Sequence, residues 1–159
     1  MTGPTRRALL IAAAASPIVP GMLVLGRDAW AKAPEIYTAP GSDLGAGGYD
    51  VIAYFDEGRA LRGREDLAAE HKGARWLFAS EAHRAAFLID PEAYLPQFGG
   101  HCSWAVSRGY TAKGDPEAWR VVDGKLYLNF NKRVRARWDE DRPGNIAKGE
   151  ANWPGLRAD

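Results

Sequence analysis

The sequence predicts a small mixed α+β domain built from β-hairpins and short helices. Asp123-Gly124 stands between two apolar runs, and Lys72-Gly73 stands between two others. Asp-Gly suits the type I′ turn of a hairpin, because both central residues of that turn take positive φ. Ser80 and Asn131 each precede a segment with helical character and can cap its free amides. Strands and helices are mixed without a regular βαβ alternation, which places the chain in the α+β class.

The first elements of the domain are predicted from apolar runs and turn residues. The compact run Val51-Ile52-Ala53-Tyr54-Phe55 predicts a buried strand. Residues 67–71 and 75–78 predict a hairpin around Lys72-Gly73, with an amphipathic helix over residues 65–72 as the competing interpretation. A helix is expected over residues 80–88, and Asp90-Pro91 begins a second short helix.

The remaining elements follow from capping residues and breakers. One or two helical turns are plausible over residues 101–107, and residues 120–122 and 125–130 predict the second hairpin. A helix over residues 132–141 is expected to end at Pro143-Gly144. A last short helix is expected over residues 145–152, followed by Trp153-Pro154 packed back on the body. No internal repeat and no low-complexity tract is visible in the sequence.

The N-terminal residues have the pattern of an export signal. Arg6-Arg7 precede an apolar stretch, and Ala29-Trp30-Ala31 has the small residues of a cleavage site before Lys32. The stretch is too short and too interrupted by proline and glycine to span a bilayer comfortably. We predict a twin-arginine (Tat-type) signal peptide over residues 1–31 and a periplasmic location. An ordinary secretory signal is the alternative, and an uncleaved leader would tether the domain to the membrane.

The remaining chain is predicted to hold a flexible arm over residues 32–47 and one domain over residues 48–156. The arm is rich in glycine and proline and poor in large apolar side chains. In the whole chain 21 Lys and Arg nearly balance 20 Asp and Glu, and no basic block stands out. Binding of nucleic acid through a charged face is therefore not expected.

Several sequence blocks stand in order along this domain. They are Gly48-Tyr49-Asp50-Val51-Ile52-Ala53-Tyr54-Phe55, Trp76-Leu77-Phe78-Ala79-Ser80, Asp90-Pro91-Glu92, Gly99-Gly100-His101-Cys102-Ser103-Trp104 and Asp123-Gly124-Lys125-Leu126-Tyr127. Together they resemble the YHS domain family, in its exported single-domain bacterial branch. The resemblance implies a small α+β fold and an association with heavy metals. Metal-associated YHS domains usually carry two cysteines where this chain has Ala79 and His83, so the paired-thiol site of those domains is absent.

Cys102 is the only cysteine of the chain and the central candidate site residue. A lone thiol in an exported protein cannot close an internal disulfide. It must be buried and inert, reactive, bonded to another molecule, or a metal ligand. A small buried thiol that packs Gly99-Gly100 against the core is the alternative without a function.

A metal site is predicted at Cys102 and His101, with His71 and His83 as further candidate ligands. A thiolate with imidazole nitrogens suits copper or zinc. Both methionines lie in the leader, so no thioether is expected to contribute. Adjacent side chains point in different directions on a strand or a helix, so His101 and Cys102 reach one ion only from an irregular loop.

The function predicted from these residues is a non-enzymatic, metal-associated or accessory binding protein centred on Cys102. Its partner would be a metal ion or a small ligand, and no catalytic residue is assigned. A thiol-based redox protein using Cys102 is one alternative. A binding module for a small ligand with an incidental thiol is the other, with scattered tryptophans and tyrosines lining a pocket or filling a core.

Overall fold

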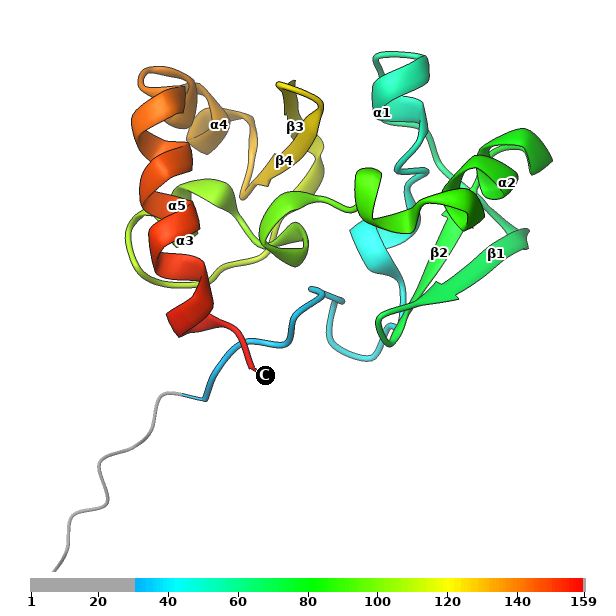
Figure 1. Ribbon diagram of the computed structural model, residues 1–159, viewed down its shortest axis with the longest axis horizontal. Helices are drawn as coiled ribbons and strands as arrows, with labels where there is room; N and C mark the ends of the chain where they lie inside the picture. Colours follow the sequence, from blue (N-terminus) through cyan, green and yellow to red (C-terminus); the bar gives the residue numbers. More distant parts are fainter. Residues whose placement is uncertain (1–30, 159) are drawn as a thin grey trace, which may run out of the picture. The chain divides into compact units, whose positions relative to one another are not determined.

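The computed structural model describes residues 31–158, and these form a mixed α+β domain (Figure 1). Two separate antiparallel sheets have two strands each, β1 with β2 and β3 with β4, and short helices surround them. The predicted fold class is therefore confirmed. Within these residues no helix combines the length and apolar character needed to cross a membrane. The predicted signal peptide, residues 1–31, lies almost entirely outside the described residues.

The first half of the domain, residues 45–89, contains a hairpin followed by a helix. Strand β1 (Arg64–His71) pairs with β2 (Ala74–Phe78). The turn residues Lys72 and Gly73 have φ values of 50° and 73°, as a type I′ turn requires. Helix α2 (Glu81–Ile89) follows. The predicted hairpin is confirmed, and the competing helix over residues 65–72 is wrong.

The second half, residues 97–139, repeats this order. Strand β3 (Asp115–Val122) pairs with β4 (Lys125–Asn129) across a turn at Asp123-Gly124, and helix α4 (Lys132–Asp139) follows. Each hairpin also has an irregularity in its register near the start of its first strand. In Figure 1 the labels β1, β2 and α2 gather on one side and β3, β4 and α4 on the other.

The segments before the hairpins repeat as well. Each begins with a 3-10 helix, η1 (Gly45–Gly48) or η3 (Gln97–Gly100), and continues into a short α-helix, α1 (Ala53–Asp56) or α3 (Ser103–Ser107). The second and third residues of η1 and η3 share left-handed φ values between 48° and 60°. The two halves therefore share one order of elements, a structural repeat that is not visible in the sequence.

Strand β4 links the two hydrophobic clusters of the domain. Leu126 and Leu128 belong to the larger cluster, which also contains Trp76 and Phe87. Tyr127 belongs to the smaller cluster with Phe98, Val106 and Trp138. Because successive side chains of a strand point to opposite faces, one strand can serve both clusters.

The apolar run at residues 51–55, predicted as a strand, is instead part of a helical turn that leads into α1. The Asp50 carboxylate accepts a hydrogen bond from the backbone N–H of Ile52 at 2.9 Å. An Asx turn of this kind favours a helical start over an extended strand. The expectation of burial holds, since Val51, Ile52 and Ala53 are fully buried.

The last helix, α5 (Arg142–Leu156), is longer than predicted. Pro143 and Gly144 do not end a helix but begin this one. Asp141 caps it by accepting the N–H of Gly144 at 3.0 Å, and Pro143 lies in the first turn, where its missing N–H is not needed.

The segment predicted as a flexible arm lies against the domain and makes specific contacts. The backbone N–H of Tyr37 donates to the Gly99 carbonyl at 2.8 Å, and the Ile36 side chain is buried. At Gly99 there is no room for a side chain, because a Cβ would collide with the Glu35 carbonyl oxygen. The segment is thus held by backbone contacts that composition alone does not reveal.

Candidate functional site

Cys102 lies between η3 and α3 with its side chain 1% exposed. Its Sγ accepts the backbone N–H of Phe130 at 3.2 Å, and the backbone amides of Trp104 and Ala105 also interact with it. Burial raises the pKa of the Cys102 thiol, and these three amides oppose that rise only in part. The thiol is therefore protonated at neutral pH.

The thiol lines a pocket of about 330 Å³. The other lining residues come from α3, α4 and the segments that follow α3 and β4: Trp104, Ala105, Tyr110, Ala112, Phe130, Val134 and Arg137. The residues Tyr110 and Phe130 are 52% and 41% exposed, which is unusual for large aromatic residues. The pocket therefore has apolar, aromatic walls that stay open to solvent.

Positive charge surrounds this pocket. Arg137 lines it directly, the Arg108 guanidinium lies 4.1 Å from the centre of a Trp104 ring, and the Lys113 ammonium lies 5.1 Å from that of Phe130. No carboxylate is among the described residues that line the pocket. This arrangement favours a ligand with a negative charge.

A buried amide group lies beside the thiol. The Asn129 side chain is fully buried, its Oδ1 accepts the N–H of Trp104 at 3.1 Å, and this oxygen lies 4.0 Å from the Cys102 Sγ. Its Nδ2 has no hydrogen-bond partner among the described residues. A buried donor without a partner costs about 1–3 kcal/mol, so polar groups near the thiol are incompletely satisfied within the chain.

His101 and Cys102 face different hollows. The His101 ring is 3% exposed, and its Nε2 lies 3.0 Å from the Pro34 carbonyl oxygen. It lines a pocket of about 620 Å³ formed largely by residues 31–42, whereas Cys102 lines the pocket described above. Burial lowers the pKa of His101, so its imidazole is neutral. The segment between η3 and α3 thus directs the two side chains apart and does not bring them to one ion.

His71 and His83 lie in the first half of the domain, each bound to a carboxylate. His71 Nε2 is 2.8 Å from Glu92 Oε1, and His83 Nδ1 is 2.6 Å from Asp50 Oδ2. Between residues 31 and 158 no three His, Cys, Asp or Glu side chains are grouped so that they could hold a metal ion. The four ligands predicted from the sequence are thus not brought together.

Sequence reasoning missed the pairing of Asp50 with His83. The Asp50 carboxylate is completely buried and also accepts the backbone N–H of Ala79 at 2.8 Å. The other ring nitrogen of His83 faces the carboxylates of Asp56 and Glu57 at 4.0 and 3.9 Å. An acid directly before the apolar run Val51-Ile52 is the signal that could have predicted a buried, partnered carboxylate.

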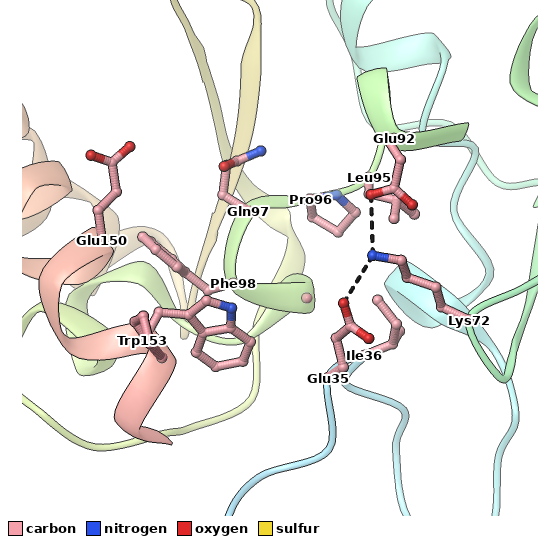
Figure 2. A pocket seen from close by; sticks show the side chains of 12 residues that line it. Glu35, Ile36, Lys72, Glu92, Leu95, Pro96, Gln97, Phe98, Glu150 and Trp153 are labelled. Atoms are coloured by element: carbon pink, nitrogen blue, oxygen red, sulfur yellow. Dashed lines mark hydrogen bonds and ion pairs between the residues drawn. The ribbon is translucent and has the colours of Figure 1, made fainter. Parts of the chain in front are cut away.

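A third hollow of about 250 Å³ lies where residues 35–36 meet both halves (Figure 2). Lys72 Nζ bridges Glu35 Oε1 at 2.8 Å and Glu92 Oε2 at 3.1 Å, while Phe98 and Trp153 lie on the other side of the hollow. One ammonium faces two carboxylates here, and Arg157 and His71 pair with the same two carboxylates. These groups find their partners within the domain, so the hollow holds the N-terminal segment in place and is less suited to a ligand.

Comparison with known proteins found no relative of this chain. No family model matches the chain, and neither the curated proteins nor the solved structures contain a match. The resemblance to the YHS domain therefore stays a prediction from the quoted residues.

Proposed function

We propose that this chain is an exported, periplasmic binding protein of the YHS type without enzymatic activity. Its pocket over Cys102 receives a small molecule with an apolar, planar body and a negatively charged end. The observation that carries this proposal is the combination of aromatic walls, a cationic rim and a buried thiol in one open pocket.

The size and walls of the pocket support a small planar ligand. A volume of about 330 Å³ lies at the lower end of the range for small-molecule sites, roughly 300–1,000 Å³. Trp104, Tyr110 and Phe130 offer ring surfaces on which a planar group can pack. An apolar ligand would cover the exposed parts of Tyr110 and Phe130, which favours binding through the hydrophobic effect.

The charges around the pocket support an anionic end group. Arg137 presents a guanidinium that can hold a carboxylate with two parallel hydrogen bonds. Arg108 and Lys113 add positive potential from the neighbouring rings of Trp104 and Phe130. A cationic ligand would meet Arg137, and no carboxylate is among the described residues that line the pocket.

The state of the thiol argues against catalysis and against a metal site centred on it. A cysteine nucleophile or metal ligand acts as a thiolate, and burial raises the pKa of Cys102. The nearest imidazole in sequence, His101, is bound to the Pro34 carbonyl and lines another pocket. Among the described residues that line the pocket, none is a base placed to take the proton of the thiol.

Thiol-based redox chemistry is the second candidate. The three backbone amides around Sγ favour it, because they would stabilise a negatively charged sulfur once formed. Rapid labelling of Cys102 by an alkylating reagent at neutral pH would support this candidate over simple binding. We expect slow labelling instead.

Calorimetric titration of the protein purified from the periplasm tests the proposal. Benzoate is expected to bind saturably and benzylamine, of similar shape and opposite charge, is not. Arg137→Gln should weaken benzoate binding about tenfold, the loss of one charged hydrogen-bonding group. Arg133→Gln, an exposed arginine of the same helix α4 outside the pocket, is the matched control and should leave binding unchanged. Equal binding of both compounds, or of neither, contradicts the proposal.

A further inference from the structure

The two halves of the domain have the same backbone arrangement but place different side chains at equivalent positions in it. Asp50 and Cys102 each follow a left-handed turn and precede a short helix. Asp50 Oδ2 accepts the N–H of Ala79, the first residue after β2, at 2.8 Å. Cys102 Sγ accepts the N–H of Phe130, the first residue after β4, at 3.2 Å. The carboxylate and the thiol are therefore structural equivalents.

The helices that follow place a second pair of residues in equivalent positions. Ser80 caps α2 by accepting the N–H of His83 at 3.1 Å. Asn131 caps α4 by accepting the N–H of Val134 at 2.8 Å. His83 and Val134 are thus the third residues of their helices. Their side chains leave the helix at the same point relative to the cap.

The side chain at this helix position decides whether the site is open. In the first half, the His83 ring reaches the buried carboxylate, with Nδ1 at 2.6 Å from Asp50 Oδ2. In the second half, Val134 is shorter and apolar, and it borders the open pocket together with Cys102 and Phe130. The pocket therefore occupies the place that corresponds to the imidazole of His83.

We infer that the ligand of the Cys102 pocket carries an imidazole-like nitrogen ring, which lies over the thiol as the His83 ring lies over Asp50. This inference rests on the proposed binding function and names the class of ligand. The molecule is a small azole with an acid group, its ring nitrogen toward Cys102 Sγ and its carboxylate toward Arg137.

The chemistry of the thiol fits a ring nitrogen better than a hydrocarbon ring. The neutral thiol donates its S–H only weakly, to Asn129 Oδ1 at 4.0 Å, and an unprotonated ring nitrogen would accept that hydrogen bond in its place. If the proton moves fully, it passes from Sγ to the ring nitrogen, and a thiolate and a ring cation remain with no other reactant needed. The amides of Trp104, Ala105 and Phe130 would stabilise that thiolate. A benzene ring fills the space but offers no such partner.

The acid group of the proposed ligand is inferred from a difference between helices α2 and α4. Arg137 of α4 stands six residues after the cap Asn131, and the residue six after Ser80 in α2 is Ala86. The first half, whose site is filled by its own imidazole, has no cation at this place. The second half adds one beside its open pocket.

The test compares binding of an imidazole carboxylate and benzoate by calorimetry. We expect the imidazole carboxylate to bind the wild-type protein about tenfold more tightly, the contribution of one additional hydrogen bond in a buried site. Cys102→Ala should remove this difference, so that this variant binds the two compounds with equal affinity. Val134→His should supply the ring from the chain itself and reduce binding of both compounds at least tenfold. Ultraviolet absorbance of the thiolate, compared with and without the imidazole carboxylate, reports proton transfer directly.

The outcomes separate the two proposals. Equal affinity for both compounds in the wild-type protein overturns the nitrogen ring and leaves the anion-binding pocket standing. Binding of neither compound overturns both. If Val134→His does not fold, Cys102→Ala still decides, because an undiminished preference for the imidazole carboxylate in that variant rules out a contact between ring nitrogen and thiol.

Discussion

The two halves of this domain share one backbone arrangement and differ in the side chains that it holds. In the first half, a buried carboxylate is closed off by a histidine from α2. In the second half, a thiol takes the place of the carboxylate and a valine takes the place of the histidine, which leaves a pocket of about 330 Å³. The comparison teaches that a duplicated arrangement can be a fixed structural element in one copy and an open site in the other.

Removal of the buried polar side chain should reduce the stability of the protein more in the first half than in the second. Asp50→Ala leaves His83 Nδ1 and the N–H groups of Ile52 and Ala79 without a partner, so we expect a loss of about 3–5 kcal/mol in the free energy of unfolding. Cys102→Ala, at the equivalent place, should cost only about 1 kcal/mol. Urea denaturation of both variants measures the difference, and equal losses would refute the contrast between the halves.

The glycines of the two left-handed turns should also differ. Gly47 and Gly99 have φ values of 59° and 60°, so alanine at either position is strained by about 1 kcal/mol. At Gly99 a Cβ would in addition collide with the Glu35 carbonyl, whereas at Gly47 it would lie 3.4 Å from the Pro116 ring.

Gly99→Ala should therefore lower the free energy of unfolding by about 3 kcal/mol, the upper range for a single overpacked position, and Gly47→Ala by about 1 kcal/mol. Thermal unfolding followed by circular dichroism compares the two variants. Gly99→Ala should also expose residues 32–37 to proteolysis. Similar stability of the two variants would mean that this segment is not held at Gly99.

The helix caps should behave alike in both halves. Ser80→Ala and Asn131→Ala each remove the acceptor for one N–H in the first turn, so each is expected to cost about 1 kcal/mol. Chemical denaturation of the two single variants is the measurement. A difference of more than about 1 kcal/mol would show that the repeated caps are not equivalent.

The smallest expected effect is a loss of stability at alkaline pH, caused by the titration of Cys102 in the second half. Burial raises the pKa of Cys102 above its ordinary value of 9.0. The unfolded thiol therefore releases its proton first, and the stabilisation is complete below pH 9.0 and declines as the pH rises through the folded pKa. Unfolding free energies of the wild-type protein and Cys102→Ala across this range should converge as the pH rises. Parallel profiles would contradict a buried, protonated thiol.

Local signals in the sequence predicted the hairpins and the caps correctly. Asp123-Gly124 and the capping residues Ser80 and Asn131 act through neighbouring backbone atoms, so their structural effect can be read from a few residues. The α+β class and both hairpins followed from such signals.

Features that depend on distant parts of the chain were not predictable in this way. The N-terminal segment is held by Gly99 and His101, more than 60 residues further along the chain. The repeat is hidden because equivalent positions hold chemically different residues, such as Asp50 and Cys102. Composition therefore predicted a flexible arm, and the repeat is not visible in the sequence.

The candidate site was predicted in part. Cys102 stood out as the only thiol, and it does line an open pocket. Its expected partner His101 faces elsewhere, since neighbouring side chains diverge. The residues that shape the pocket, Val134 and Arg137, carry no sequence signal that distinguishes them from an ordinary helix face.

Strand β4 contributes alternate side chains to both hydrophobic clusters, so we expect it to couple the stability of the two halves. Binding of a ligand in the second half should therefore also stabilise the first half. An anion bound over Cys102 at a hundred times its dissociation constant would add about 2.7 kcal/mol to the stability of the occupied state. Amide protons of the β1–β2 hairpin, far from the ligand in sequence, should then exchange with solvent more slowly.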